Sequence, residues 1–182
     1  MSSILKDARL ERYNMITGEE AKEKIISILK ASDIGRLSLL DERYPYIIPT
    51  NHVCFRGGLV MHGSFGGKKI ELMKRSKLAS YEVDYPLEAP KTKVLTCHLE
   101  YESTILYGEV RPVDDREERY ECLKALSDEY GLPFKHGGEE GCNALFFLIH
   151  EATARTGRFL PAAQKDLYYY SFRIGEGGNH EV

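Results

Sequence analysis

Hydrophobic and polar positions divide this chain into short β-forming runs, separated by turn signals and interrupted by three stretches of helical period. Residues 34–55 predict two strands joined at a polar turn. The glycine pair at 57–58 is a hairpin signal that leads into the next strand. The remaining runs that predict strands are residues 59–64, 77–85, 94–113 and 144–159. Strands therefore dominate the predicted structure.

Three helices are predicted between these strands. Residues 18–31 follow Thr17, which forms a capping-box pattern with Glu20 three residues later. Residues 114–131 begin with two aspartates, which favour a helix N-terminus, and end at a glycine, which favours a C-terminus. A shorter helix is predicted within residues 65–76. The apolar positions of the three helices are Ile25, Ile28, Leu29, Ile70, Leu72, Met73, Leu123 and Leu126.

The order of these elements lacks regular βαβ units, so it favours an α+β, mostly β fold: an antiparallel barrel or sheet with flanking helices. Pro49 cannot donate a backbone hydrogen bond, so it marks a bulge or an open edge of the sheet. Gly108 predicts a bulge inside a strand. No repeat or linker divides residues 1–182, which we expect to form one domain, with residues 174–182 as a disordered tail.

Composition narrows the class of partner. With 182 residues, 42% of them hydrophobic and 29% charged, the chain resembles a soluble globular domain. A net charge of −3 without a long basic run argues against nucleic acid. No apolar run reaches the roughly 18 residues that span a bilayer, and no signal-peptide core is visible, so no membrane partner is expected. Four widely spaced cysteines without a CxxC pair favour reduced thiols, and hence the cytoplasm.

The segment 60–74 contains a candidate anion site. Two glycines stand directly before Lys68 and Lys69, which open a predicted helix. Backbone amides at a helix start attract anions, and two ammonium groups there oppose the helix dipole unless an anion lies between them. A strand, a turn that begins at Ser64 and this helix start can therefore hold an anion. The alternative is a solvated lysine pair after a flexible turn.

The usual nucleotide and metal motifs do not fit. A Walker A loop around the Gly67-Lys68 pair needs glycine at position 62 and Ser or Thr at position 69, which are His62 and Lys69. No GxGxxG follows a predicted strand. The HEATA run at 150–154 lacks the second histidine of a zinc motif, so no metal site is expected.

His62 ends a predicted strand immediately before the candidate anion site. Gly63 after it allows the backbone to approach a ligand closely. His62 is therefore either a proton donor near a bound ligand or a residue that braces the end of the strand through a hydrogen bond.

Residues 34–84 and 101–131 together resemble the pyridoxamine 5′-phosphate oxidase-like flavoproteins, and within them the nitroimidazole-resistance-like branch. The shared pattern comprises a Gly-x-Leu strand, a tyrosine-x-x-proline strand, a strand ending in histidine, a glycine-lysine helix start and a Tyr-x-Ser strand ending in glycine. The resemblance covers about residues 18–160, leaving the two ends peripheral. It implies a six-stranded antiparallel split β-barrel with flanking helices, which forms a homodimer with FMN at the subunit interface.

The resemblance also implies which residues hold FMN. Lys68 and Lys69 occupy positions where the family places basic residues against the FMN phosphate, and Ser64 belongs to the same turn. The strand that includes Pro49 would lie with its backbone along the isoalloxazine ring. The full set of implied cofactor-binding residues is Pro49, Thr50, Asn51, His62, Ser64, Lys68, Lys69, Ser103 and Thr104.

The implied function is that of an FMN-dependent oxidoreductase that reduces a small electrophile such as a nitro compound, with His62 as the candidate catalytic residue. Vitamin B6 oxidation is not expected, because the substrate-reading arginines of the oxidase proper have no clear counterpart; Arg155 and Arg158 are candidates of unknown role. Two alternatives stay open. One is a haem-handling split barrel with His62 or His98 as a ligand, and the other is a flavin-binding module without turnover.

Overall fold

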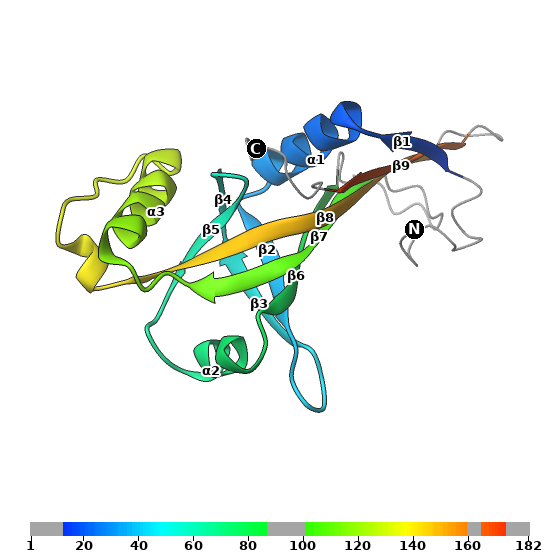
Figure 1. The fold of residues 1–182 in the computed structure, drawn as a ribbon. Coiled ribbons are helices and arrows are strands. Elements are labelled where there is room, and N and C mark those ends of the chain that lie inside the picture. Colours follow the sequence, from blue (N-terminus) through cyan, green and yellow to red (C-terminus); the bar gives the residue numbers. More distant parts are fainter. Residues whose placement is uncertain (1–12, 87–100, 160–164, 174–182) are drawn as a thin grey trace, which may run out of the picture.

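The structure is a computed structural model that describes residues 13–86, 101–159 and 165–173. These residues form nine β-strands, three α-helices and one short 3₁₀ helix (Figure 1). The strands are β1 (Asn14–Thr17), β2 (Ile34–Leu39), β3 (Tyr46–Asn51), β4 (Val53–Phe55), β5 (Gly58–Gly63), β6 (Leu78–Pro86), β7 (Tyr101–Pro112), β8 (Asn143–Phe159) and β9 (Lys165–Arg173). The helices are α1 (Glu19–Ala31), α2 (Lys68–Arg75), α3 (Arg116–Glu129) and the 3₁₀ helix η3 (Gly138–Glu140).

Six strands form one continuous antiparallel row in the order β3-β2-β6-β7-β8-β5. The strands at its two ends, β3 and β5, contact each other, but within the described ranges no ladder of hydrogen bonds joins them. A row that curls until its ends meet without pairing is a barrel split along one seam. The predicted split barrel with flanking helices is thereby confirmed.

Three further strands make the sheet larger than predicted. β4 pairs with β5, β9 pairs with the second half of β8, and β1 pairs with β9 in parallel. The described sheet is therefore nine-stranded and mixed, where the sequence predicted six antiparallel strands. β9 was not predicted, although tyrosines such as its three consecutive ones, residues 168–170, favour strands.

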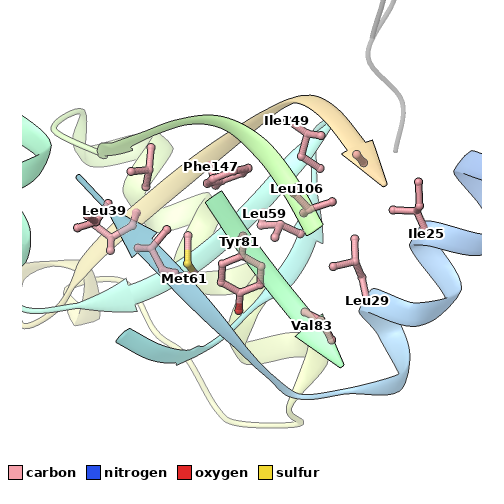
Figure 2. Packing of buried hydrophobic residues seen from close by; sticks show 14 of the residues in the cluster. Ile25, Leu29, Leu39, Leu59, Met61, Tyr81, Val83, Leu106, Phe147 and Ile149 are labelled. Atoms are coloured by element: carbon pink, nitrogen blue, oxygen red, sulfur yellow. The ribbon is translucent and has the colours of Figure 1, made fainter. Parts of the chain in front are cut away.

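The barrel core forms because successive residues on each strand point to opposite faces. On β7 buried and half-exposed residues alternate along most of the strand. Figure 2 shows Tyr81 of β6 at the centre of the core, close to Leu59 and Met61 of β5 and Leu106 of β7. All four side chains are fully buried. The Tyr81 hydroxyl donates to the backbone oxygen of Thr50 at 2.9 Å, so a core residue also fixes the end of β3.

The helices cover different parts of the barrel. α1 buries its apolar face against the barrel and contacts β1 and β9, whereas α2 contacts β2 and β7. α3 packs on β4, β5 and the start of β8 through a second apolar cluster that includes Cys122, Leu123 and Leu126. In Figure 1, α2 and α3 lie toward the end where β8 begins, and α1 lies toward β1 and β9. Among the described residues, no helix is long and apolar enough to cross a membrane.

Several local predictions can be checked directly. Pro49 lies on β3, the edge strand beyond β2, and the register of β7 against β8 shifts between Tyr107 and Gly108, so the predicted edge and bulge are confirmed. The capping box was wrong, although the helix begins where expected. Thr17 is the last residue of β1, where it pairs with β9, and Gly18 is the N-cap of α1 without a side-chain bond.

Candidate functional site

The turn between β5 and α2, residues 64–69, is built by glycine, and we call it the glycine turn. Gly67 has a φ of 94°, in the region that L side chains rarely adopt. Ser64 Oγ donates to the backbone oxygen of Gly66 at 2.8 Å, which closes the turn on itself. A Cβ atom placed on Gly66 or Gly67 would meet no atom within 4 Å, so the outer side of the turn is open.

The start of α2 supplies backbone N–H groups next to the glycine turn. Ile70 N–H donates to the backbone oxygen of Gly67 at 3.0 Å and is the first to bond within the helix. The amides of Lys68 and Lys69 precede that bond, as the first N–H groups of any helix do. They therefore add partial positive charge where the sequence predicted an anion.

Lys68 forms an ion pair with a residue of the same chain. Its ammonium lies 2.7 Å from the Asp41 carboxylate in the β2–β3 turn and 4.9 Å from the centre of the Tyr46 ring. The hydrogen bond to Asp41 raises the pKa of Lys68, and the same bond lowers the pKa of Asp41. Lys68 therefore already has an anionic partner within the chain.

Lys69 points away from that pair. Its ammonium lies against Gly63, because a Cβ atom built on Gly63 would be 2.3 Å from Lys69 Nζ. Lys69 is half-buried, and burial lowers the pKa of its ammonium. Within the described part of the chain it forms no ion pair with a carboxylate. A cation removed from water without a counter-charge is unfavourable, so this position suits an external anion.

The predicted residues of β3 lie beside the open seam of the barrel. Pro49 is exposed, and Thr50 and Asn51 are half-exposed. The Thr50 hydroxyl donates to the backbone oxygen of Asn51, and the Asn51 amide donates to that of Asp33, each at 3.2 Å. Their side chains are therefore occupied, and what β3 offers a ligand is its backbone edge and the surface around Pro49.

Ser103 and Thr104 cannot both face a ligand through their side chains, because neighbours on β7 point to opposite faces. Thr104 is 1% exposed and its hydroxyl donates to the backbone oxygen of Thr153 at 2.9 Å. Thr104 stays a predicted cofactor-binding residue on β7, and from this position it could reach a ligand only through its backbone. Ser103 lies on the outer face, opposite the exposed Arg155 of β8, whose guanidinium lies over the Tyr169 ring.

His62 and Asn51 meet at a cavity of about 460 Å³ beside α3, which we call the α3 cavity. His62 is exposed at the end of β5, and its Nδ1 lies 3.9 Å from the Cys142 sulfur. Cys142 was not among the residues predicted to belong to the site. Because 80 residues separate it from His62, no local spacing could have revealed the contact.

Two predicted positions cannot be placed. His98 lies outside the described residues, and of Arg158 only the backbone, in β8, is described. Where side chains are described, no cluster of three or more His, Cys, Asp or Glu residues could hold a metal ion.

A model of the pyridoxamine 5′-phosphate oxidase family matches residues 21–156, most of the chain. The chain belongs to this family. The predicted resemblance is thereby confirmed at the level of the family. No curated protein gives a significant match to the chain.

Several solved structures have a similar fold. A candidate 5-nitroimidazole antibiotic resistance protein from Bacteroides thetaiotaomicron has 18% identity and a TM-score of 0.64, over 82% of this chain and 86% of that one. The FAD and haem binding protein of Mycobacterium smegmatis has 17% identity and a TM-score of 0.64, over 85% and 84%. The flavocytochrome Anf3 of Azotobacter vinelandii has 16% identity and a TM-score of 0.61, over 85% and 79%. At these identities the likeness is one of fold.

Proposed function

We propose that the protein binds FMN and acts as an oxidoreductase that reduces a small electrophile, such as a nitro compound. The observation that carries the proposal is Lys69, a half-buried ammonium that forms no ion pair with a described carboxylate, beside an open glycine turn. In a member of this family, that position fits the phosphate of a flavin nucleotide. Flavin- and haem-binding proteins among the structures of similar fold support the ligand class.

The residues present fit the two ends of FMN. The phosphate end needs hydrogen-bond donors and positive charge, which the amides at the start of α2 and the Lys69 ammonium supply. The ring end needs a flat, partly apolar surface, which the exposed edge of β3 around Pro49 supplies. Bound FMN would supply the electron and hydride chemistry.

The chain's own residues would then bind, orient and transfer protons. Lys69 holds the phosphate, and Lys68, already paired with Asp41, adds only longer-range attraction. His62 offers an exposed imidazole at the end of β5. Its ring nitrogens can donate a proton or a hydrogen bond to a reduced substrate.

We further propose that the working unit is a homodimer with FMN at the interface. Three large apolar side chains on the outer face of the sheet, Ile34, Ile47 and Leu78, are each more than half exposed. The strand registers place them on the same face as Pro49. A two-fold interface over this face would bury these side chains and create two equivalent flavin sites.

One experiment tests the cofactor and the alternatives together. The purified protein is examined by absorption spectroscopy, with the released cofactor identified by chromatography against FMN and FAD. We expect a flavin spectrum, FMN on release, and bleaching when reduced nicotinamide is added under nitrogen. A haem Soret band would favour the haem-handling alternative, and a flavin that never bleaches with any donor would favour a passive binding module.

The proposed homodimer has its own test. Sedimentation should give roughly twice the chain mass of 20.7 kDa.

A further inference from the structure

A second hollow lies between the C-terminal half of α2 and the start of α3, and we call it the α2–α3 cleft. The end of β7, the glycine turn and the start of β8 complete its walls. Its volume of about 770 Å³ lies in the range of sites that enclose small organic molecules. His62, Lys68 and Lys69 are not among the described residues that line it, so the proposed flavin site does not explain this cleft.

Several charged side chains of the cleft are paired within the chain. Arg111 forms an ion pair with Glu118 at 2.5 Å, and Arg75 forms one with Glu42 at 3.4 Å. The Asp115 carboxylate accepts a hydrogen bond from the Glu118 N–H at 2.8 Å, as the N-cap of α3. These groups stabilise the walls of the cleft and have little left to offer a ligand.

Three cations of the cleft have no carboxylate partner. Among the described residues, neither Lys74 nor Lys77 forms an ion pair, and both are exposed. Arg119 donates only to uncharged backbone oxygens, at 3.0 to 3.1 Å. Asp114 is the carboxylate of the cleft that forms no ion pair with a described residue. Because the whole chain carries a net charge of −3, this local excess of positive charge indicates an anionic ligand.

Asn143, at the start of β8, gives independent evidence for a ligand. It is 4% exposed, and its backbone pairs with Gly63, but its carboxamide forms no hydrogen bond with a described side chain or backbone group. No fully buried side-chain nitrogen or oxygen of the described residues lacks a partner, so this carboxamide opens into the cleft that Asn143 lines. A buried carboxamide with a free donor and acceptor suits a ligand that bonds to both.

Phe65 adds an aromatic surface at the mouth of the cleft. Its ring is 50% exposed, and the Arg119 guanidinium lies 5.5 Å from the ring centre. An exposed aromatic ring beside a cation is the kind of surface on which proteins stack a planar base. The cleft therefore combines positive charge, a buried carboxamide and a ring.

We propose that the α2–α3 cleft binds a nucleoside phosphate other than the flavin. The phosphates meet Lys74 and Lys77, the base lies against Phe65, and one edge of the base bonds to Asn143. The Asp114 carboxylate can accept hydrogen bonds from ribose hydroxyls. This inference does not rest on the proposed function, because none of the predicted cofactor-binding residues lines the cleft.

Matched probes test the class of ligand. ADP, GDP and UDP are compared with their nucleosides, which lack the phosphates, and with pyrophosphate, which lacks the base. Binding is measured by isothermal titration calorimetry with the flavin-free and the FMN-loaded protein. We expect at least one nucleotide to bind both forms, and its nucleoside and pyrophosphate each to bind about tenfold more weakly or worse. Binding of none of the three nucleotides, or equal binding of a nucleotide and pyrophosphate, would overturn the proposal.

Lysine variants locate the phosphates. Lys74→Ala and Lys77→Ala should each weaken the nucleotide severalfold and leave its nucleoside unchanged. The matched control is Lys135→Ala, which removes the same charge from an exposed lysine outside the cleft and should bind like the wild type. Lysines near the end of a helix can also simply stabilise it. In that case Lys74→Ala would lower the melting temperature but bind the nucleotide normally, which would contradict the assignment.

Two further variants locate the base. Phe65→Leu removes the ring from a half-exposed position, and Asn143→Ala removes the carboxamide but keeps the backbone pairing of β8. Both should weaken the nucleotide severalfold and leave pyrophosphate binding nearly unchanged. Equal losses of nucleotide and pyrophosphate in these variants would mean that the cleft does not recognise a base.

The outcome for the proposed function can be read separately. If FMN displaces the nucleotide from the flavin-free protein, the cleft belongs to the flavin site and the proposal of a second nucleotide site is wrong. If the nucleotide binds as expected but the protein takes up no flavin, the assignment of the cleft stands and the proposed oxidoreductase function fails.

Discussion

The glycine turn and the segment after α3 each hold a charged side chain that is at least half-buried, but only one of the two charges is paired within the described chain. The Glu139 carboxylate after α3 accepts hydrogen bonds from the Gly137 amide at 2.8 Å and from Arg116 at 3.1 Å. The Lys69 ammonium at the glycine turn forms no ion pair with a carboxylate in the described chain. A charge satisfied within the chain stabilises the fold, and one left without a counter-charge indicates where a ligand binds.

Folding lowers the pKa of both Glu139 and Lys69, which favours the charged form of the glutamate but disfavours that of the lysine. Hydrogen bonds from backbone amides, its own and that of Gly137, together with Arg116, lower the pKa of Glu139, so folding favours the ionised carboxylate. Burial lowers the pKa of Lys69, so folding disfavours its charged form. A bound phosphate would reverse the second effect, because it favours the ammonium.

The largest effect is expected from a change at His62, which should lower turnover without weakening FMN binding at the glycine turn. His62→Gln should lower the rate of nitro reduction by about 10²-fold, the low end for acid–base catalysis, because the proton donor is lost. The FMN content should stay near that of the wild type, since His62 lies in the α3 cavity. Steady-state kinetics and flavin absorbance measure the two quantities. Full activity with normal flavin content would make His62 structural.

The next effect compares the two adjacent lysines. Charge-assisted hydrogen bonds are typically worth about 1.5–3 kcal/mol, so Lys69→Ala should weaken FMN binding roughly tenfold or more. Lys68→Ala should weaken it much less, because Lys68 is already paired with Asp41. Titration of the flavin-free protein by flavin fluorescence gives both constants. If both variants lose the same amount of FMN affinity, the different directions of the Lys68 and Lys69 side chains do not matter for FMN binding.

A smaller effect comes from moving the ammonium without removing it. A Cβ on Gly63 would lie 2.3 Å from Lys69 Nζ, the flexible end of that side chain, so Gly63→Ala should displace the ammonium and leave the fold intact. We expect FMN affinity to fall severalfold. Gly141→Ala is the control, because Gly141 lies outside the glycine turn and a Cβ there meets only the backbone oxygen of Gly138, at 3.7 Å. If both variants bind FMN like the wild type, the position of the Lys69 ammonium is unimportant.

The smallest effects concern stability of the flavin-free protein. Glu139→Gln should lower the melting temperature at neutral pH, and the difference should fade as pH falls below the ordinary glutamate pKa of 4.5 and through the lowered folded value. Lys69→Met should raise the melting temperature at neutral pH, and this gain should fade as pH rises through the lowered Lys69 pKa toward the ordinary 10.5. Calorimetry across pH measures both. Changes of the opposite sign would contradict the comparison.

Much of the fold could be predicted because its signals are local. The turn at the start of β5, where Gly57 has a φ of 76°, the edge position of Pro49 and the bulge at Gly108 all follow from the backbone properties of glycine and proline. The capping box at Thr17 failed because pairing of β1 with β9 holds that residue in a strand, and tertiary pairing overrides a local cap preference.

The candidate site could be predicted only in part. The glycine turn was readable from the sequence, but the direction of each lysine depends on Asp41, which lies 27 positions before Lys68 (68 − 41), and on Gly63. The interior position of Thr104 depends on the register of β7 against β8. The meeting of His62 and Cys142 depends on the antiparallel pairing of β5 with β8.

The central claim is that Lys69 holds the phosphate of FMN, and a ligand–variant cycle tests it most directly. FMN and riboflavin, which lacks the phosphate, are titrated into the flavin-free wild type and Lys69→Ala by fluorescence quenching. We predict that the wild type prefers FMN by roughly tenfold or more, that Lys69→Ala loses most of this preference, and that riboflavin binds the two proteins alike. Equal affinity of the wild type for FMN and riboflavin, or equal loss of both ligands in the variant, would contradict the account.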